Sequence, residues 1–163
     1  MSIGNADIQK TIKTAWIAGG LETKFTDLGG DSPALNYDEA SPEHEQPYCV
    51  WNLAAPDTEV RMSGSSSITI KQEIRNCVLR FDVHTKPVSG DARGASQIAA
   101  YLIEEIMKVF GGHPTETASA DLTMDNGCVL DIGYMRDYCV RTGNNNYQWP
   151  LEYQVTVDVP VAA

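Results

Sequence analysis

The sequence predicts an α+β protein: a mostly antiparallel sheet with two main helices packed on one face, plus a long acidic loop. Two segments carry apolar residues at helical spacing, and several others alternate apolar and polar residues as half-buried strands do. The clearest alternation is YQWPLEYQVTVDV at residues 147–159, where every odd position is apolar. Strands and helices occur in runs, which favours α+β over a regular strand–helix alternation. A chain of 163 residues is expected to form one domain, 1–163.

The first helix is predicted at residues 8–21. An apolar stripe recurs at four-residue spacing and a Gly-Gly pair ends the segment. The stripe consists of Ile8, Ile12 and Trp16, joined by Ile17. Such a stripe packs either on the core or on a partner, and packing on the core is the preferred interpretation.

Residues 22–46 differ in kind, because they hold seven carboxylates against one lysine and contain Gly29-Gly30, Pro33 and Pro42. Glycine and proline at these positions predict an irregular segment. Loops of this length in compact domains are usually functional or mobile. A long acidic loop is therefore expected, either with a role in binding or as a solvated excursion.

Extended structure is predicted from residue 47 to residue 85. PYCVWNLA (47–54) and TEVRM (58–62) are expected as separate strands, followed by a serine-rich turn at 63–67 and a longer strand. In that longer strand, one face is apolar and consists of Cys77, Leu79, Phe81 and Val83. The alternation predicts that this face is buried.

The second helix is predicted within residues 94–112, since GASQIAAYLIEEIMKVFGG combines an apolar stripe with a Gly-Gly stop. The stripe consists of Ile98, Ala99, Leu102, Ile103, Ile106 and Phe110. An antiparallel meander is expected to follow, with a tight turn at Asp-Asn-Gly (125–127), a bulge or bend at Gly133 and a further turn at 142–146. The helix is expected to cover the sheet.

In the last strand, Trp149, Tyr153 and Val155 are predicted to face the core, and the alternating polar residues to face solvent or a neighbour. Pro150 cannot donate to a ladder, so this part of the strand is expected at an edge or a bulge.

Charge and composition exclude several classes of function. The net charge of −10 argues against general nucleic-acid binding, although an acidic wall would let DNA pass without adhering. No apolar run approaches the ~18 residues of a membrane span, and no signal-peptide core is recognised. A soluble cytosolic protein is expected. Its four cysteines are then expected as reduced, packed thiols, with structural disulfides as the alternative.

Residues suited to catalysis are few. Asp82 and His84 share one strand face and would suit a base and its orienting acid, but no nucleophile accompanies them. His44 between Glu43 and Glu45 would suit a transition metal, although a solvated charge run is the simpler reading. None of the Gly-Gly pairs has the context of a phosphate-binding loop. We therefore expect no enzymatic activity, no cofactor and no metal site.

The order of elements resembles that of the tail terminator, or tail-completion, proteins at the head–tail junction of long-tailed bacteriophages. The resemblance runs through the amphipathic helix IQKTIKTAWIAGGL (8–21), the Pro47-Tyr48 pair that opens a strand, and the strand-plus-helix segment EIRNCVLRFDVHT…GASQIAAYLIEEIMKVFG. It ends in the meander CVLDIGYMRDYCVRTGNNNYQWPLEYQVTVDV, with Arg136-Asp137 just before a turn.

This resemblance implies a structural virion protein of the tail and neck, assembled in the host cytoplasm. Such a protein would form a homo-oligomeric ring, expected to be a hexamer, at the top of the tail tube. The ring would stop tube polymerisation and dock the neck or head-closure protein. Its implied partners are further copies of itself, the tail tube protein and the neck protein. DNA would pass through without sequence-specific binding, and no membrane is involved.

Two sets of residues are candidates for this role. The subunit or tube interface is expected to include Ser65, Ser67, Thr69, Lys71, Asn144, Gln148, Glu152 and Gln154. The acidic loop either lines the lumen or faces outward, and its candidates are Asp27, Asp31, Asp38 and Glu39. The alternatives are another neck protein, such as a head-closure or head–tail adaptor protein, and a small cytosolic ligand-binding or enzymatic α+β domain.

Overall fold

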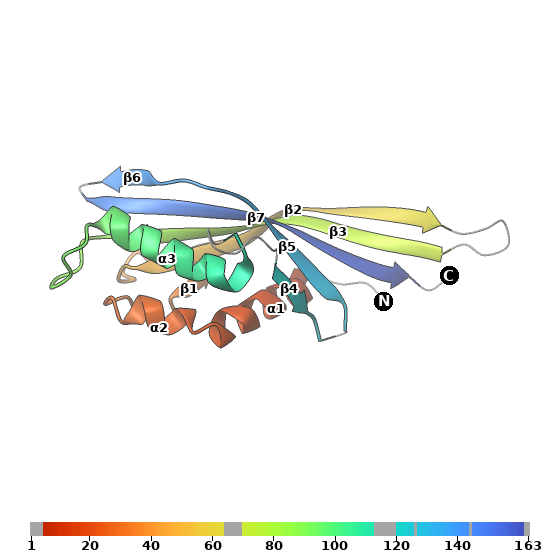
Figure 1. The fold of residues 1–163 in the computed structure, drawn as a ribbon, viewed down its shortest axis with the longest axis horizontal. Coiled ribbons are helices and arrows are strands. Elements are labelled where there is room, and N and C mark those ends of the chain that lie inside the picture. The colour runs from red at the N-terminus through yellow and green to blue at the C-terminus, as the bar shows by residue number, and fades with distance from the viewer. Residues whose placement is uncertain (1–4, 64–69, 113–119, 126, 144, 162–163) are drawn as a thin grey trace.

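A computed structural model describes residues 5–63, 70–112, 120–125, 127–143 and 145–161 (Figure 1). The helices are α1 (Asn5–Ala18), α2 (Leu21–Thr26) and α3 (Ala95–Phe110). The strands are β1 (Leu35–Tyr37), β2 (Tyr48–Ser63), β3 (Ile70–Thr85), β4 (Ala120–Thr123), β5 (Val129–Asp137), β6 (Val140–Gly143) and β7 (Asn146–Val161). The predicted α+β class is confirmed.

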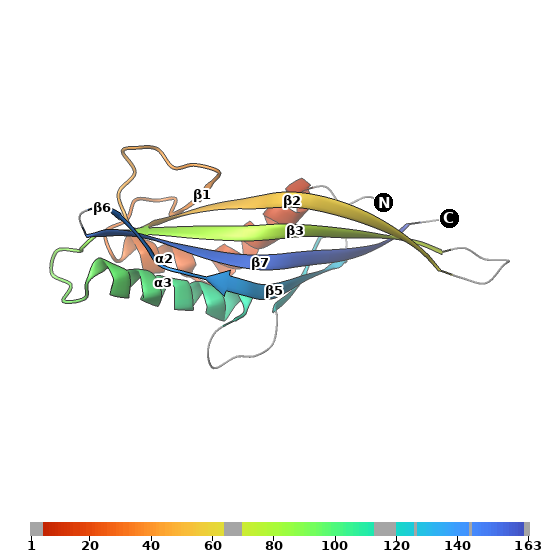
Figure 2. The same cartoon turned by 90° about the horizontal axis from the view of Figure 1, so that it is seen from above.

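The strands form one sheet in the order β1-β2-β3-β7-β5-β4, with β6 paired to β7 beyond the end of β5. Every pairing is antiparallel except that of β1 with β2. All three helices lie on one side of the sheet (Figure 1), and the view from above looks onto its other, open face (Figure 2). The sheet is therefore covered on one face only, as the alternating sequence predicts.

An aromatic cluster centred on Phe81 of β3 fills the space between sheet and helices. Its ring lies 5.0 Å from that of Phe110 in α3, 5.8 Å from that of Trp16 in α1 and 6.3 Å from that of Tyr153 in β7. All four side chains are almost completely buried. One residue thus joins two helices to the two central strands.

The first predicted helix exists as α1 with the short α2 after it. Its stripe of Ile8, Ile12 and Trp16 is buried in the core, whereas Ile17 is 63% exposed. The predicted stop is confirmed, because Gly20 takes a φ of +68° before α2 begins. A side chain at Gly19 would collide with Val109 of α3, since an added Cβ would lie 2.5 Å from its Cγ2. The absent side chain lets the end of α1 approach α3.

The second predicted helix is α3, and its whole predicted stripe is buried against β3 and β7. The Gly-Gly stop is confirmed, since Gly111 and Gly112 take positive φ angles. The Gly111 carbonyl accepts a hydrogen bond of 2.7 Å from the Tyr153 hydroxyl. The end of α3 is thereby fixed to the central strand β7.

Two segments are more regular than the sequence predicts. The two strands expected at 47–54 and 58–62 are one strand, β2, with a register irregularity between Ala54 and Asp57. The acidic segment contains α2 and β1. It is tied together by the Glu22 carboxylate, which accepts hydrogen bonds from the Ser32 hydroxyl and the Ala34 amide, both at 2.8 Å. These tertiary bonds stabilise elements that local sequence does not specify.

Pro150 predicted an edge or a bulge for this part of the last strand; the strand is central, so the edge alternative is wrong. β7 pairs with β3 along its whole length and with β5 and β6 on its other side. The Pro150 carbonyl accepts a 3.2 Å hydrogen bond from the Tyr138 amide. Because N and O of one residue point the same way in an antiparallel ladder, the proline nitrogen faces the junction between β5 and β6. Pro150 therefore lacks its N–H at a position where the ladder of β7 with β5 and β6 is already interrupted.

The bulge predicted at Gly133 lies slightly further along the chain, between Tyr134 and Arg136 of β5. None of the helices in the described part of the chain is long and apolar enough to cross a membrane.

Phe81→Ala is expected to lower the free energy of unfolding by about 3–5 kcal/mol, because it removes the ring that contacts both helices and leaves a cavity. Urea unfolding followed by tryptophan fluorescence measures the change. The matched control is Ile17→Ala on the exposed face of α1, expected within about 0.5 kcal/mol of the wild type. Equal effects of the two substitutions would contradict the central position of Phe81.

Candidate functional site

The open face of the sheet carries an ion network across its three central strands. Glu152 of β7 is only 7% exposed and accepts a hydrogen bond from Arg136 of β5. Arg80 of β3 lies 4.0 Å from the same carboxylate and donates its Nε–H to both oxygens of Asp82, at 2.9 and 3.1 Å. These four charges are thus paired within the chain, which gives this part of the open face a polar surface with defined geometry.

Four of the predicted interface residues lie in the described part of the chain, three of them on β7 and one on β3. In β7, Gln154 is exposed, Gln148 is half-buried and Glu152 is engaged in the ion network. The backbone of Lys71 pairs with Met62 of β2 and Val161 of β7. The remaining candidates lie outside the described residues, namely Ser65, Ser67, Thr69 and Asn144. The role of this set stays a prediction.

The predicted acidic residues Asp27, Asp31, Asp38 and Glu39 are all exposed. They divide between two regions. Asp27 and Asp31 follow α2, where Asp31 accepts a 3.0 Å hydrogen bond from the Glu45 amide. Asp38 and Glu39 follow β1, where the Asp38 amide donates to the Trp51 carbonyl at 2.9 Å. A role in lining a lumen is untested for all four residues.

The residues considered for catalysis are occupied by structural contacts. Both Asp82 oxygens accept from Arg80, and the His84 ring stacks on Tyr48 at 4.8 Å between centroids. Burial lowers the pKa of His84, an effect that the nearby Asp82 charge opposes. His44 packs edge-on against the same tyrosine at 5.4 Å. These contacts make an aromatic stack at one end of the open face.

No group of three or more metal-ligating side chains occurs among the residues that the structure describes. All four cysteines are free thiols. Cys49 and Cys77 are buried, as expected for thiols packed in the interior, whereas Cys139 is exposed. Burial raises the pKa of the Cys49 thiol well above its ordinary value.

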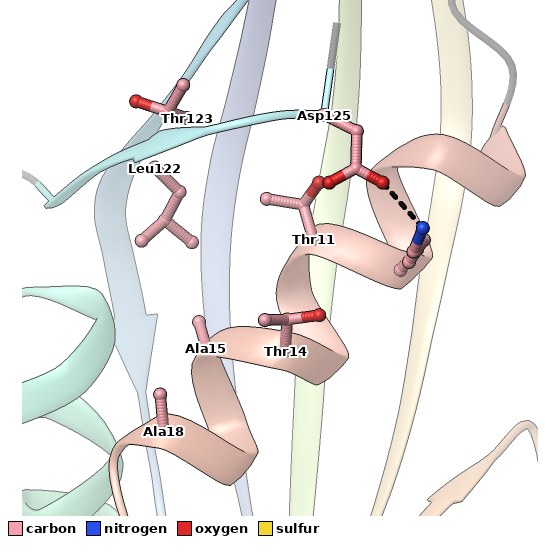
Figure 3. A pocket seen from close by; sticks show the side chains of 8 residues that line it. Thr11, Thr14, Ala15, Ala18, Leu122, Thr123 and Asp125 are labelled. Carbon is pink, nitrogen blue, oxygen red and sulfur yellow. Dashed lines mark hydrogen bonds and ion pairs between the residues drawn. The ribbon is translucent and has the colours of Figure 1, made fainter. Parts of the chain in front are cut away.

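A groove lies between α1 and the edge strand β4 (Figure 3). Its volume is about 150 Å³, and its polar lining residues are Lys10, Thr11, Thr14, Thr123 and Asp125. The Lys10 ammonium lies 2.5 Å from the Asp125 carboxylate, and the hydrogen bond raises the pKa of the lysine (Figure 3). This pair links α1 to the turn after β4.

A second groove lies on the opposite side of α1, beside β1. It has a volume of about 360 Å³. We call it the α1–β1 groove, and it is lined by Ala6, Gln9, Lys10, Lys13, Leu35, Tyr37 and Trp51. Tyr37 and Trp51 meet edge-to-face at 5.0 Å between ring centroids. The sheet side of this groove is therefore apolar and aromatic.

Exposed apolar side chains concentrate on β5 and β6. Five of the seven large hydrophobic side chains exposed in the described part of the chain lie between residues 129 and 140. Four of them, which we call the 134–140 ridge after their place in the chain, are 40–47% exposed: Tyr134, Met135, Tyr138 and Val140. They do not share one face, because Tyr134 packs towards the end of α3 whereas Val140 pairs with Gln148 on the open face. β4 pairs with β5 only as far as Ile132, so the outer edge of β5 beyond that point pairs with none of the described strands. Exposed apolar side chains beside an open strand edge are typical of interaction surfaces.

Sequence reasoning missed this ridge. The segment GYMRDYCV was identified as a strand, but its alternation is weak because the bulge after Tyr134 changes which face each later residue takes. A usable signal was the unusual density of tyrosine and methionine around Arg136, the residue types enriched in protein interfaces.

Tyr134 is held in place from two sides. Its hydroxyl donates a hydrogen bond to Asp137, whose other oxygen accepts a 2.7 Å hydrogen bond from the Trp149 indole. Its ring packs on Gly112, where an added Cβ would lie 2.7 Å from the ring. The hydrogen bond to Asp137 raises the pKa of Tyr134 to about 12. The ridge is thus anchored to the end of α3.

No protein-family model and no curated protein matches the sequence. The fold matches a chain of a solved structure described as the virion of a native gene transfer agent (GTA) particle. The two chains are 17% identical, with a TM-score of 0.51, and the match covers 95% of this chain and 97% of the other. The shared architecture therefore extends over nearly the full length of both chains, and at this identity it establishes the fold.

The Tyr134–Asp137 hydrogen bond predicts that Tyr134 loses its proton at a higher pH than an ordinary tyrosine. The pKa of the Tyr134 hydroxyl is higher in the folded protein than in the unfolded chain. The contribution of this hydrogen bond to the stability of the fold is therefore complete below pH 10 and is lost as the pH rises from about 10 to 12. Tyrosine ¹³Cζ chemical shifts measure the titration, with Tyr134→Phe assigning the signal. Asp137→Asn should return the pKa towards 10. A wild-type Tyr134 that titrates at the ordinary value would contradict the bond.

Glu152→Gln should lower the free energy of unfolding by about 1–3 kcal/mol, since it removes the charge that Arg80 and Arg136 share. Chemical denaturation of the purified chain measures the loss. The neighbouring Gln154→Ala on the same face serves as the matched control and should stay within about 0.5 kcal/mol of the wild type. If the two variants are equally stable, the ion network contributes nothing measurable.

Proposed function

We propose that this chain is a structural protein of a phage-like virion and forms a homo-oligomeric ring, a hexamer, at the top of a tail tube. The ring ends tube growth and offers a docking surface to the neck. Its partners are other copies of itself, the tube protein and a neck or head-closure protein. The proposed function is to hold these partners in a fixed geometry. The observation that carries the proposal is the end-to-end fold likeness to a chain of a gene transfer agent virion.

The shape of the sheet supports an assembly role. β2, β3 and β7 run on together well past the helices as a narrow three-stranded extension (Figures 1 and 2). Its backbone pairs on both sides of β3, as at Glu59↔Ile74 and Ile74↔Asp158. Such an extension can reach a neighbouring subunit or the tube.

Charge supports the passage of DNA through such a ring. The chain carries a net charge of −10, so its surface repels phosphates. Asp27, Asp31, Asp38 and Glu39 are all exposed and are the candidates for a lumen wall.

Tube capping tests the proposal directly. The chain, added to polymerising tube protein from the same phage-like element, should arrest elongation and appear as a ring at one end of each tube in electron micrographs. Deleting its gene should yield tails of uncontrolled length. The lengths are measured on negatively stained particles.

Bovine serum albumin at equal mass controls for nonspecific effects on polymerisation. Tails of normal length that fail to join heads after the deletion would identify an adaptor or head-closure protein. Unchanged elongation with no bound ring would reject the terminator role.

A further inference from the structure

We propose that a cavity between α3 and β5 receives the side chain of an arginine from a second, basic protein of the virion. The inference rests on the proposed function for the identity of the partner as a virion protein, and it adds the chemistry by which that partner is recognised. It does not follow from the fold likeness, because 17% identity carries no residue-level correspondence.

The cavity lies on the helix side of the sheet. α3 and β5 lie along the same side of the sheet in the view from above (Figure 2). The volume of the cavity is about 250 Å³, which accommodates one long side chain. We call it the α3–β5 cavity, and it is lined by Ala100, Ile103, Glu104, Met107, Gly112, Tyr134, Asp137 and Trp149.

The lining of the cavity includes two carboxylates and no cationic side chain. Asp137 is half-buried, and its two oxygens accept from uncharged donors, the Tyr134 hydroxyl and the Trp149 indole. Glu104 is exposed. Neither carboxylate forms an ion pair with a residue in the described part of the chain. Two negative charges at one cavity attract a cation, because a concave site of one charge sign concentrates the opposite sign.

Lys108, four residues after Glu104 on α3, has the helical spacing of an ion-pair partner. Its ammonium instead donates a hydrogen bond to Glu105 at 2.8 Å. That bond is the largest cause of the raised pKa of Lys108, and the charge of Glu104 is the smallest. Glu104 therefore remains available to a cation from outside the chain.

The uncharged part of the lining suits the stem of a long cationic side chain. Ala100, Ile103 and Met107 supply apolar atoms from α3, and Tyr134 and Trp149 supply aromatic rings. Lysine and arginine both bury a methylene stem along apolar surface and keep the charged head at polar groups. Arginine also packs its planar guanidinium on aromatic rings and donates to carboxylates through several N–H groups, whereas lysine is a compact point charge. The lining therefore favours arginine.

The arginine is expected from a different protein rather than from a second copy. The structure describes the side chains of four arginines, and three of them pair with carboxylates of their own chain: Arg80, Arg93 and Arg136. The fourth, Arg141, donates to the Gly143 carbonyl at 3.2 Å. Two copies, each with a net charge of −10, also repel each other, whereas a basic partner is attracted.

Titration of the purified chain with a capped arginine tests the cavity. The probe is N-acetyl-arginine methylamide, and its matched control is the capped citrulline, which has nearly the same shape without the charge. The methyl signals of Ala100, Ile103 and Met107 and the indole N–H of Trp149 are followed by NMR. Arginine should bind saturably and at least about fivefold more tightly than citrulline, the ratio expected for one partly exposed charge pair.

Glu104→Gln should weaken the binding of capped arginine about fivefold and leave that of citrulline unchanged, because it removes a charge and retains the shape. Glu43→Gln is the matched control, since Glu43 is also exposed and lies outside the cavity, and it should bind arginine as the wild type does. Circular dichroism and thermal unfolding verify that both variants are folded. Equal binding of arginine and citrulline, no loss with Glu104→Gln, or no shift at about 10 mM probe overturns the proposal.

Assembly assays separate this inference from the proposed function. Glu104→Arg places a cation of the chain's own at the cavity, so it should reduce the fraction of capped tubes or of tails joined to heads at least about fivefold at limiting protein. A variant that caps and joins as the wild type does overturns the proposed partner and leaves the function standing. A wild type that binds capped arginine at the cavity but never binds tube ends supports the cavity and rejects the function.

Sedimentation velocity distinguishes the remaining occupant, a second copy. Glu104→Arg should leave the self-association of the chain unchanged, because the arginine comes from another protein. A variant that assembles at least about fivefold more weakly than the wild type would assign the arginine to a neighbouring copy and overturn the proposal.

Discussion

The pairing of β7 with β3 is the constraint on which the rest of the fold depends. It runs without interruption from Lys71↔Val161 to Thr85↔Tyr147, and β7 also carries β5 and β6 on its other side. A slip of one residue would turn Tyr153 from the helices to the open face and break its bond to the end of α3. Because the partners are distant in sequence, the core closes only when the C-terminal strand enters the middle of the sheet.

Local pattern predicted the elements that bury one face, and it did not predict the order of the strands. The stripes of α1 and α3 and the inward face of β3 follow from periodicity alone. α2 and β1 were missed because they depend on distant partners, such as the bonds from Glu22 to Ser32 and Ala34. Pro150 suggested an edge or a bulge because the sequence shows that residue 150 lacks a backbone N–H. It does not show which strand, if any, lies on the side to which that nitrogen points.

The interaction surfaces were harder to predict for the same reason. Whether a residue such as Met135 is exposed depends on where β4 stops pairing with β5, and on the bulge that redirects the strand. Glu152 illustrates the converse. Alternation placed it correctly on the polar face, but its burial at 7% exposure depends on arginines from two other strands. The alternation of the sequence predicts which face of a strand a residue takes. The pairing of that strand with its neighbours then determines whether the residue is exposed to a partner.

Open sheet edges must be available for assembly without causing indiscriminate association, and the chain combines both requirements. β2 has a register irregularity next to Pro56, a combination that interrupts a flat edge, and the Lys10–Asp125 ion pair joins α1 to the turn that follows the edge strand β4. The β5 edge beyond Ile132 instead presents an arginine and a bulge between its apolar side chains. In the proposed ring, these features would leave the β5 edge beyond Ile132 available to a neighbouring copy. The twist of the sheet would then set the rotation between copies, and hence whether the contact closes into a ring or continues as a fibre.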